Sequence, residues 1–294
     1  MADPNNQNTA IARKGSETPA GRLNAFLSNP TRLKNLATYA RNHVNPATMI
    51  RLAVFAAGFL GARPFSQAML TDIAEEFSTQ AMPDRTLPVD WNIKPTQDIY
   101  IIKNDAIEIA SWGLVAPWSK DSAQALKSQS QAINARSESV HEKPTFRSAF
   151  KQRRCLVPAS GYYEWATELG QYKTKQPVFI SRDDNKLLAF AGIYDRWISP
   201  QGEIRDSVAI ITRDAVGDLA RVHNRMPLFL PRDRWDAWMD SDLNDVEQVR
   251  SLMKVSHPDE HLRFWPVSTL VNSIRNNGAE LIAPIELGEP ETLF

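Results

Sequence analysis

The amino-acid sequence predicts an α+β fold in which many short strands are combined with a few helices. Short apolar runs recur along the chain and end near Pro, Gly, Asn or Asp, which is the pattern of strands separated by turns. Far fewer segments space their apolar residues as a helix requires. Because no internal repeat divides the chain, we expect one main domain over residues 63–294, preceded by an extension over residues 1–62.

Charge and cysteine content restrict the function. The 294 residues include 34 Lys and Arg and 34 Asp and Glu, so any nucleic-acid site must be a local basic patch on a neutral chain. The single cysteine, Cys155, cannot form an internal disulfide and indicates a reducing compartment, so we expect a cytoplasmic protein. The sequence contains no His-Glu-x-x-His motif, and we expect neither a bound metal nor a cofactor.

The N-terminal extension has a composition of its own. Its first twenty residues are polar and are expected to be disordered, and residues 22–42 have the spacing of a weak basic helix. The apolar segment 52–61 is too short to span a bilayer. It has the length of a signal-peptide core, which would matter only if translation began at Met49. We expect a packed or partner-bound helix over Met49–Ala62 instead.

The main domain is expected to begin with a helix and a pair of strands. Residues 69–77 carry apolar side chains at helical spacing, with a start near Thr71 or Asp72. An extended, proline-containing segment follows over 87–97. Two short strands then flank a turn at Asn104-Asp105, over residues 99–102 and 107–112. Further strands are expected at Leu156–Val157, Val178–Ile180, Leu188–Ile193 and Val208–Thr212, and further helices at Val216–Val222, Arg232–Met239 and residues 243–254.

One carboxylate lies among aromatic residues and is a candidate acid or base. The apolar run Cys155–Val157 predicts a buried strand that Pro158 ends, and Gly161 permits a tight bend. Glu164 follows, flanked by Tyr162, Tyr163 and Trp165. Aromatic walls exclude water and raise the pKa of a carboxyl group, which suits proton transfer. The alternative is an edge-strand Glu beside ordinary core aromatics.

Other polar residues stand within apolar stretches, and each has a structural alternative. Asn134 is a candidate site residue, although Asn often caps a turn. Arg136 and Arg147 are candidate phosphate contacts, or else solvated surface charges. His223 is a candidate acid or base, or else a partly buried, hydrogen-bonded histidine.

The tryptophans and the cysteine favour the structural alternative. Trp112 and Trp118 are more typical of a core than of a stacking platform for bases. Cys155 lies in the apolar strand and is interpreted as a small buried hydrophobe.

Several ordered motifs together resemble the SOS-response-associated peptidase (SRAP) family. The resemblance covers about 230 residues, from near Phe65 to the end of the chain. It rests on Trp91–Gln97, Trp112–Trp118, Asn134–Glu138, Arg154–Trp165, Ala189–Tyr194, His223–Pro227, Pro266–Ser268 and Val271-Asn272. It implies the SRAP fold, with curved, mostly antiparallel, barrel-like sheets flanked by a few helices, and a monomer.

The resemblance also implies a chemistry. Members of the family bind abasic sites in single-stranded DNA during the SOS and DNA-damage response. An N-terminal cysteine, exposed by self-cleavage, closes a thiazolidine on the sugar aldehyde. Asn134 would orient the N-terminal residue, Glu164 would shuttle protons, and His223 would act on the sugar oxygen. DNA contacts would come from Trp112, Arg136, Arg147 and Arg225.

This sequence departs from the family at the nucleophile. Family members begin Met-Cys-Gly-Arg, whereas here the corresponding stretch before the first helix reads Leu60-Gly61-Ala62-Arg63-Pro64-Phe65. The cysteine's position is Gly61 or Ala62. Cys155 cannot replace it, because its main-chain nitrogen lies within the chain and provides no free amine. The alternative function is therefore a non-catalytic module that binds single-stranded DNA and uses the N-terminal extension for a partner.

Overall fold

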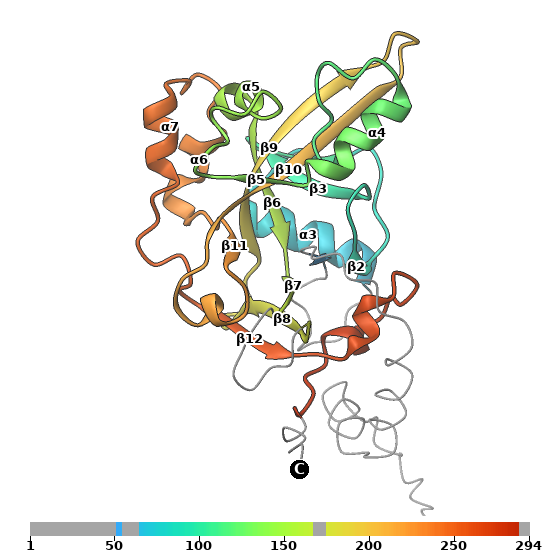
Figure 1. The fold of residues 1–294 in the computed structure, drawn as a ribbon, viewed down its shortest axis with the longest axis vertical. Coiled ribbons are helices and arrows are strands. Elements are labelled where there is room, and N and C mark those ends of the chain that lie inside the picture. Colours follow the sequence, from blue (N-terminus) through green and yellow to red (C-terminus); the bar gives the residue numbers. More distant parts are fainter. Residues whose placement is uncertain (1–50, 55–64, 167–174, 288–294) are drawn as a thin grey trace, which may run out of the picture.

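Two β-sheets, packed against each other and covered by a few helices, form the domain (Figure 1). The structure is a computed structural model, and it describes residues 51–54, 65–166 and 175–287. The predictions for residues 1–50 and for Gly61 and Ala62 therefore lie outside the described residues. Within the described residues, no helix is long and apolar enough to cross a membrane.

The larger sheet closes on itself. Its strand order is β11-β10-β4-β3-β6-β9, and β9 pairs back onto β10, so five strands form a closed, barrel-like ring to which β5 and β11 are added along β10. Among the strand pairs of the described residues, β10–β4 and β10–β5 are parallel and the others are antiparallel. The predicted mostly antiparallel, barrel-like α+β fold is thus confirmed. The strands are β3 (Asp98–Lys103), β4 (Ala106–Trp112), β5 (Asn134–Arg136), β6 (Arg154–Ala159), β9 (Leu188–Ile198), β10 (Ile204–Asp214) and β11 (Arg225–Pro227).

The smaller sheet has the order β12-β8-β7-β1-β2. Its strands are β1 (Arg51–Val54), β2 (Asp90–Ile93), β7 (Gly161–Trp165), β8 (Pro177–Arg182) and β12 (Leu262–Pro266).

The strand β1 lies between β7 and β2, where Arg51 pairs with Tyr163 and Leu52 pairs with both Tyr162 and Ile93. The prediction of a helix here is therefore wrong for residues 51–54, because their backbone is satisfied by two neighbouring strands. These residues precede the predicted domain boundary at 62/63, which itself stays a prediction.

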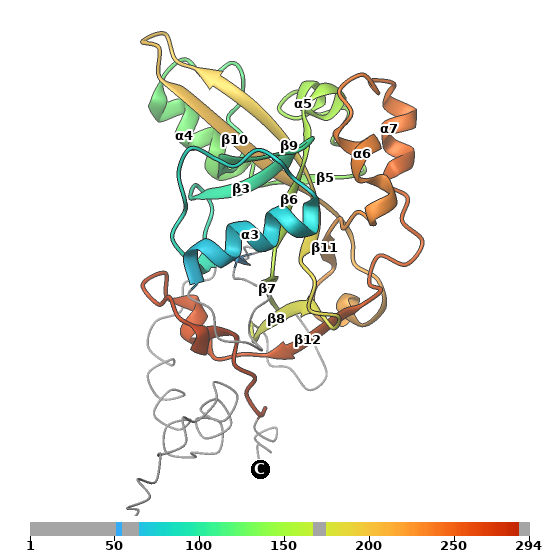
Figure 2. The same ribbon diagram turned by 180° about the vertical axis from the view of Figure 1, so that it is seen from behind.

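The helices surround the sheets. The predicted helix over 69–77 is confirmed as α3, which starts earlier than expected, at Phe65, and lies across the strands (Figure 2). The segment Val216–Val222 forms a 3₁₀ helix rather than an α-helix.

The sequence patterns did not predict α4 or α5. The side chain of Asp121 caps α4 by accepting a hydrogen bond from the Gln124 N–H at 2.7 Å. The remaining helices are α4 (Ser122–Gln131), α5 (Arg147–Gln152), α6 (Trp235–Met239) and α7 (Val246–Leu252), with 3₁₀ segments at Gly217–Arg221, Arg232–Arg234, Thr269–Asn272 and Ala279–Ile282.

Pro158 does not end the strand that contains Cys155. It lies inside β6 and pairs with Ala189 of β9. The strand β3 reaches β6 only at Leu156, so beyond that residue β6 pairs with β9 alone. A residue without an N–H group is tolerated where one side of a strand has no neighbour.

Candidate active site at Glu164 and His223

The strand β7 presents its side chains alternately to two cores. Tyr162 packs in the large apolar cluster of the barrel, whereas Tyr163 and Trp165 pack in the smaller cluster beneath the second sheet. Because side chains two residues apart on a strand share a face, Glu164 points to the same side as Tyr162. Glu164 therefore lies between the two sheets, and aromatic rings cover both faces of β7.

Gly161 allows this strand to lie against β8. A Cβ at residue 161 would lie 2.2 Å from Cζ of Phe179 and 2.6 Å from the carbonyl oxygen of Ile180. Glycine is needed here for close approach, rather than for the tight bend that the sequence suggested.

Glu164 is a buried acid. Its exposed fraction is 3%, and burial raises its pKa from the ordinary 4.5 to about 8, against a smaller lowering effect from the Trp165 N–H, which donates to Oε1 at 3.0 Å. The other oxygen, Oε2, is buried without a hydrogen-bond partner. At neutral pH most of these carboxyl groups therefore carry a proton, as the aromatic surroundings predicted.

His223 lies beside Glu164. Its Nδ1 is 3.9 Å from Oε2 of Glu164, which is too long for a direct hydrogen bond but short enough for one water molecule to bridge. Nδ1 lies 3.1 Å from the Arg225 N–H, which donates to it when the ring proton is on Nε2, and 3.3 Å from the Arg225 carbonyl oxygen, which accepts from it when the proton is on Nδ1. Burial raises the pKa of Glu164 and lowers that of His223, and neither shift is caused by the charge of the other residue. Glu164 and His223 therefore form a neutral pair rather than an ion pair.

Asn134 occupies a strand rather than a turn. It pairs with Ile210 in the parallel ladder between β5 and β10, and its Oδ1 is buried without a hydrogen-bond partner. Because buried polar atoms normally have partners, this acceptor at the start of β5 is a candidate for a hydrogen bond from an external donor. The structure gives no contact that joins Asn134 to Glu164, so their shared role stays a prediction.

The predicted phosphate contacts separate into two groups. Arg136 and Arg147 are exposed, and neither guanidinium forms an ion pair or hydrogen bond with the described residues. In contrast, Arg225 pairs with both oxygens of Glu138, at 2.9 and 3.0 Å, and with Asp214 at 2.5 Å. The prediction that Arg225 binds DNA finds no support, because its charge is already neutralised and only 17% of its side chain is exposed.

Trp112 cannot contact DNA as predicted. It is fully buried, and its Nε1–H donates to the Ile133 carbonyl at 3.1 Å. The core alternative is correct for this residue. Trp118 behaves differently: it is 53% exposed and is the tryptophan available to a ligand in that motif.

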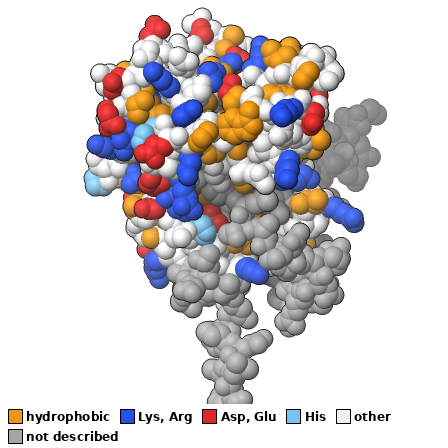
Figure 3. Space-filling model, turned by 45° about the horizontal axis from the view of Figure 1, so that its top comes forward, with side chains coloured by type: hydrophobic (Ala, Val, Ile, Leu, Met, Phe, Trp, Pro, Cys, Tyr) orange, Lys and Arg blue, Asp and Glu red, His pale blue; other side chains and the backbone are white. Residues whose placement is uncertain are grey.

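Charged side chains of both signs are interspersed over the face shown in Figure 3, with apolar side chains between them and no single sign prevailing. On this face, phosphate binding would therefore depend on individual arginines rather than on a continuous basic field. Within the described ranges, no three His, Cys, Asp or Glu side chains gather closely enough to hold a metal ion.

Comparison with known proteins identifies the family. Residues 62–274 match the family "SOS response associated peptidase (SRAP)". The chain is 35% identical over 216 residues to the abasic site processing protein YoqW of Bacillus subtilis, covering 72% of this chain and 93% of that protein. It is 38% identical over 201 residues to the abasic site processing protein HMCES of Gallus gallus, covering 61% of this chain and 58% of that protein.

Solved structures show the same fold. A protein from Bacteroides thetaiotaomicron superimposes with a TM-score of 0.58 at 26% identity, covering 65% of this chain and 82% of that one. A protein from Bordetella bronchiseptica gives a TM-score of 0.60 at 22% identity, covering 76% of this chain and 100% of that one. The family match includes Glu164, His223 and every strand of the two sheets except β1, and this chain belongs to the SOS response associated peptidase family.

Proposed function

We propose that this protein binds abasic sites in single-stranded DNA and performs acid–base chemistry on the opened sugar. The observation that carries the proposal is the neutral Glu164–His223 pair, in a family whose relatives are named abasic site processing proteins. An abasic deoxyribose opens to an aldehyde, and an aldehyde reacts through proton transfers that a buried acid and a neutral imidazole can supply. Such a role places the protein where DNA is repaired, at the nucleoid.

The two groups divide the proton transfers. As the ring opens, His223 gives its Nε2–H to the ring oxygen of the sugar, which becomes a hydroxyl, and takes a proton on Nδ1 from Glu164 through a water molecule. The anomeric hydroxyl returns a proton to the Glu164 carboxylate as it becomes the aldehyde. A neutral amine that attacks the aldehyde carbon gives a carbinolamine, and protonated Glu164 then supplies the proton with which its hydroxyl leaves as water. The carboxylate regains a proton from the iminium nitrogen. Glu164 is suited to both directions because its pKa of about 8 is close to neutral pH.

The amine in this scheme is the α-amine of an N-terminal residue, as in the family. The strand β1 supports this geometry, because Arg51 pairs with Tyr163, the residue next to Glu164 on β7. A chain that began just before β1 would place its α-amine beside the acid. Hydrolysis of the peptide bond before β1, with water as the group that attacks the carbonyl carbon, would use the same carboxyl group to protonate the departing amine. A thiol on the new first residue would add to the imine carbon and close a thiazolidine.

DNA contacts are assigned to the exposed, unpaired groups. Arg136 follows Asn134 on β5, and Arg147 opens α5, so both charges are free for phosphates. Trp118 offers the exposed ring on which a base can stack. Contacts to the bases and phosphates on either side of the sugar would hold the strand in place while Glu164 and His223 act on the abasic residue.

The test compares two single-stranded oligonucleotides that differ only in having an abasic site or a thymidine at one position. We expect the full chain to bind the abasic strand at least about tenfold more tightly, since only that strand fits a sugar without a base into the pocket. Glu164→Gln should keep this preference, because the amide resembles the protonated acid. Equal affinity for the two strands would contradict the proposal.

A further inference from the structure

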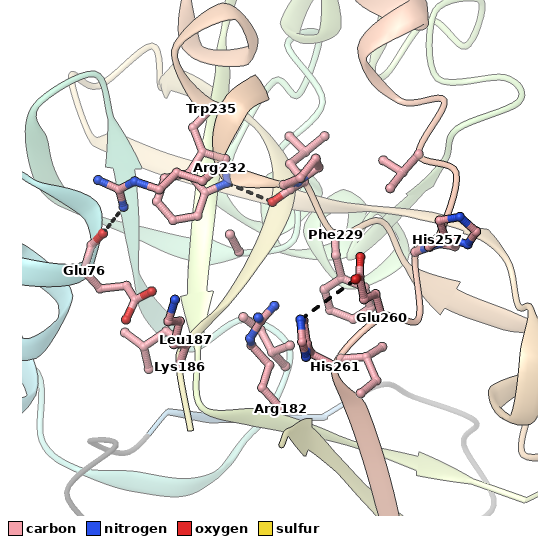
Figure 4. A pocket seen from close by; sticks show the side chains of 17 residues that line it. Glu76, Arg182, Lys186, Leu187, Phe229, Arg232, Trp235, His257, Glu260 and His261 are labelled. Carbon is pink, nitrogen blue, oxygen red and sulfur yellow. Dashed lines mark hydrogen bonds and ion pairs between the residues drawn. The ribbon is translucent and has the colours of Figure 1, made fainter. Parts of the chain in front are cut away.

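A pocket that neither Glu164 nor His223 lines lies at the other end of the smaller sheet. It has a volume of about 240 Å³ and is formed by α3, the turn after β8, the segment after β11 and the loop before β12. Figure 4 shows Arg182 and His261 near its centre, with Glu76 and Lys186 on one side and Glu260 on the other. Its floor is apolar and includes Leu188, Ala189, Phe229, Leu230 and Val255.

Phe229 provides the aromatic surface of this pocket. It is partly exposed, and its ring packs against Phe190 at 5.3 Å and Tyr162 at 6.1 Å between ring centres. The other aromatic residue, Trp235, is already covered, by the ring of Phe77 at 4.5 Å and by the Arg232 guanidinium at 5.0 Å. A planar ligand in the pocket would therefore stack on Phe229, which is held in place from behind.

The rim holds charged groups of both signs, and two of them, the Lys186 ammonium and the Glu76 carboxylate, form no ion pair or hydrogen bond among the described residues, although both line the pocket. Arg182 is held by Asp184 through two hydrogen bonds, at 2.7 and 2.6 Å. Its pKa is raised by the bonds to Asp184, and the Glu76 charge helps to raise it. The pocket thus offers a free donor and a free acceptor above an aromatic floor.

These features exclude simpler ligands. A metal ion is not expected, because His257, Glu260 and His261 line the pocket without forming a group of metal ligands in this part of the structure. Inorganic phosphate would use the cations but would be repelled by Glu76 and Glu260, and it would leave the apolar floor uncovered.

We propose that this pocket binds a single nucleotide. The base would stack on Phe229, a carboxylate would accept hydrogen bonds from the N–H groups at the base edge, and Lys186 would bind the phosphate. The pocket volume of about 240 Å³ is smaller than the roughly 300–1,000 Å³ of pockets that hold drug-sized ligands, so it suits a ligand with one base.

Two sources can supply this nucleotide: a free nucleotide in solution, or one residue of the DNA strand bound at Glu164 and His223. Glu164 pairs with Val178 of β8, and Arg182 lies four residues further along the same face of that strand. At about 3.3 Å per residue the pocket is roughly 13 Å from the acid, or about four nucleotides of a stacked strand. A flanking nucleotide can therefore reach it. This DNA source rests on the proposed function, whereas the free-nucleotide source does not.

The experiment measures binding of dGMP to the full chain by calorimetry, with inorganic phosphate as the probe that lacks a base. We expect saturable binding of dGMP and binding of phosphate at least about tenfold weaker. Lys186→Ala and Phe229→Leu should each weaken dGMP binding about tenfold, through loss of a charged hydrogen bond and of stacking. Lys127→Ala, on the exposed face of α4, is the matched control and should change nothing.

A second arm uses abasic oligonucleotides that end at the abasic site or extend six nucleotides beyond it on either side. If the pocket takes a nucleotide of the strand, one extension should tighten binding to the wild type but not to Lys186→Ala. Preference for the abasic site is measured separately, so its failure would affect the proposed function alone. The nucleotide site is refuted if dGMP and both extensions bind the wild type and Lys186→Ala equally, or if phosphate alone binds as well as dGMP.

Discussion

The proton on Glu164 links the candidate site to the stability of the fold. Its pKa is about 8 in the folded protein and 4.5 when exposed, so between these pH values the folded state holds more protons than the unfolded state. The free energy of unfolding therefore falls as pH rises through this window, and the loss is complete above pH 8. The size of the effect is at most roughly 5 kcal/mol, because each unit of pKa shift is worth about 1.4 kcal/mol.

We predict that Glu164→Gln removes this pH dependence. Glutamine has the shape of the protonated acid and does not titrate, so the variant should match the wild type near pH 5 and be more stable than it at pH 8.5. Urea unfolding of both proteins at the two pH values measures the difference. A wild type and variant that lose stability in parallel over this range would show that Glu164 is not buried as a neutral acid.

Arg136 tests which charges contact DNA. We predict that Arg136→Glu weakens binding of a single-stranded oligonucleotide by about tenfold or more and lowers the salt dependence of the binding constant, because a phosphate contact is replaced by a repulsion. Arg225→Gln should have little effect on this salt dependence, since Glu138 and Asp214 already neutralise that charge. Filter binding between 50 and 200 mM salt, roughly the range over which such contacts weaken, provides the measurement.

The control is Arg263→Glu, an exposed reversal on β12 at the edge of the smaller sheet. If this variant loses as much affinity as Arg136→Glu, binding reflects overall charge, and the assignment of Arg136 fails.

At the scale of elements, Arg154 connects α5, α6 and the loop after α6. It begins the Arg154–Trp165 motif and is only 2% exposed. Its guanidinium donates to the carbonyl oxygens of five residues, Phe150, Lys151, Trp238, Asp240 and Leu243. No carboxylate forms an ion pair with it in the described residues. Burial lowers its pKa, against a smaller raising effect of the Asp240 charge, and the carbonyl dipoles hold the guanidinium charge.

We predict that Arg154→Leu lowers the free energy of unfolding by about 3 kcal/mol or more, because several buried carbonyls lose their donor. Arg154→Lys should rescue little, since an ammonium has three donors and cannot reach carbonyls on three sides. Arg153→Ala removes a partly exposed pair with Asp195 at 3.0 Å and should cost less than about 1 kcal/mol. Urea unfolding ranks the three variants, and equal losses at Arg153 and Arg154 would contradict this account.

At the scale of the whole molecule, the start of the chain determines covalent capture. We predict that the full chain gives no denaturant-stable adduct with an abasic oligonucleotide. A shortened chain that begins Met49-Ile50, with Ile50→Cys, should give one once the methionine is removed, because β1 then carries an α-amine and a thiol to Glu164. In that chain Glu164→Gln should slow adduct formation by roughly 10²–10⁴-fold. Denaturing gels measure the adduct.

The comparison chain begins with Met-Cys-Gly at positions 60–62, the place at which the sequence motif locates the nucleophile. It lacks β1, so β7 and β2 lose their common neighbour, and we expect lower stability and little adduct. If this chain forms the adduct and the chain that begins at Met49 does not, the geometry inferred from β1 is wrong.

Local patterns in the sequence were enough to predict much of the fold. Alternating and continuous apolar runs located β3, β4, β8, β9 and β10, and helical spacing located α3, because these periods depend on neighbouring residues only. The aromatic residues next to Glu164 likewise predicted a raised pKa, because they indicated a buried strand and burial raises the pKa of a carboxyl group. Cys155 proved to be buried, as its apolar neighbours indicated.

The tertiary structure alone decided the contacts between residues that are distant in the sequence. The strand β1 has an apolar pattern that also suits a helix, and only pairing with β7 and β2 makes it a strand. The distance from Glu164 to His223, the neutralisation of Arg225 by Glu138 and the burial of Trp112 depend on how the barrel closes. No local period encodes these pairings, because a side chain's partner and exposure are set by whichever distant strand packs beside it.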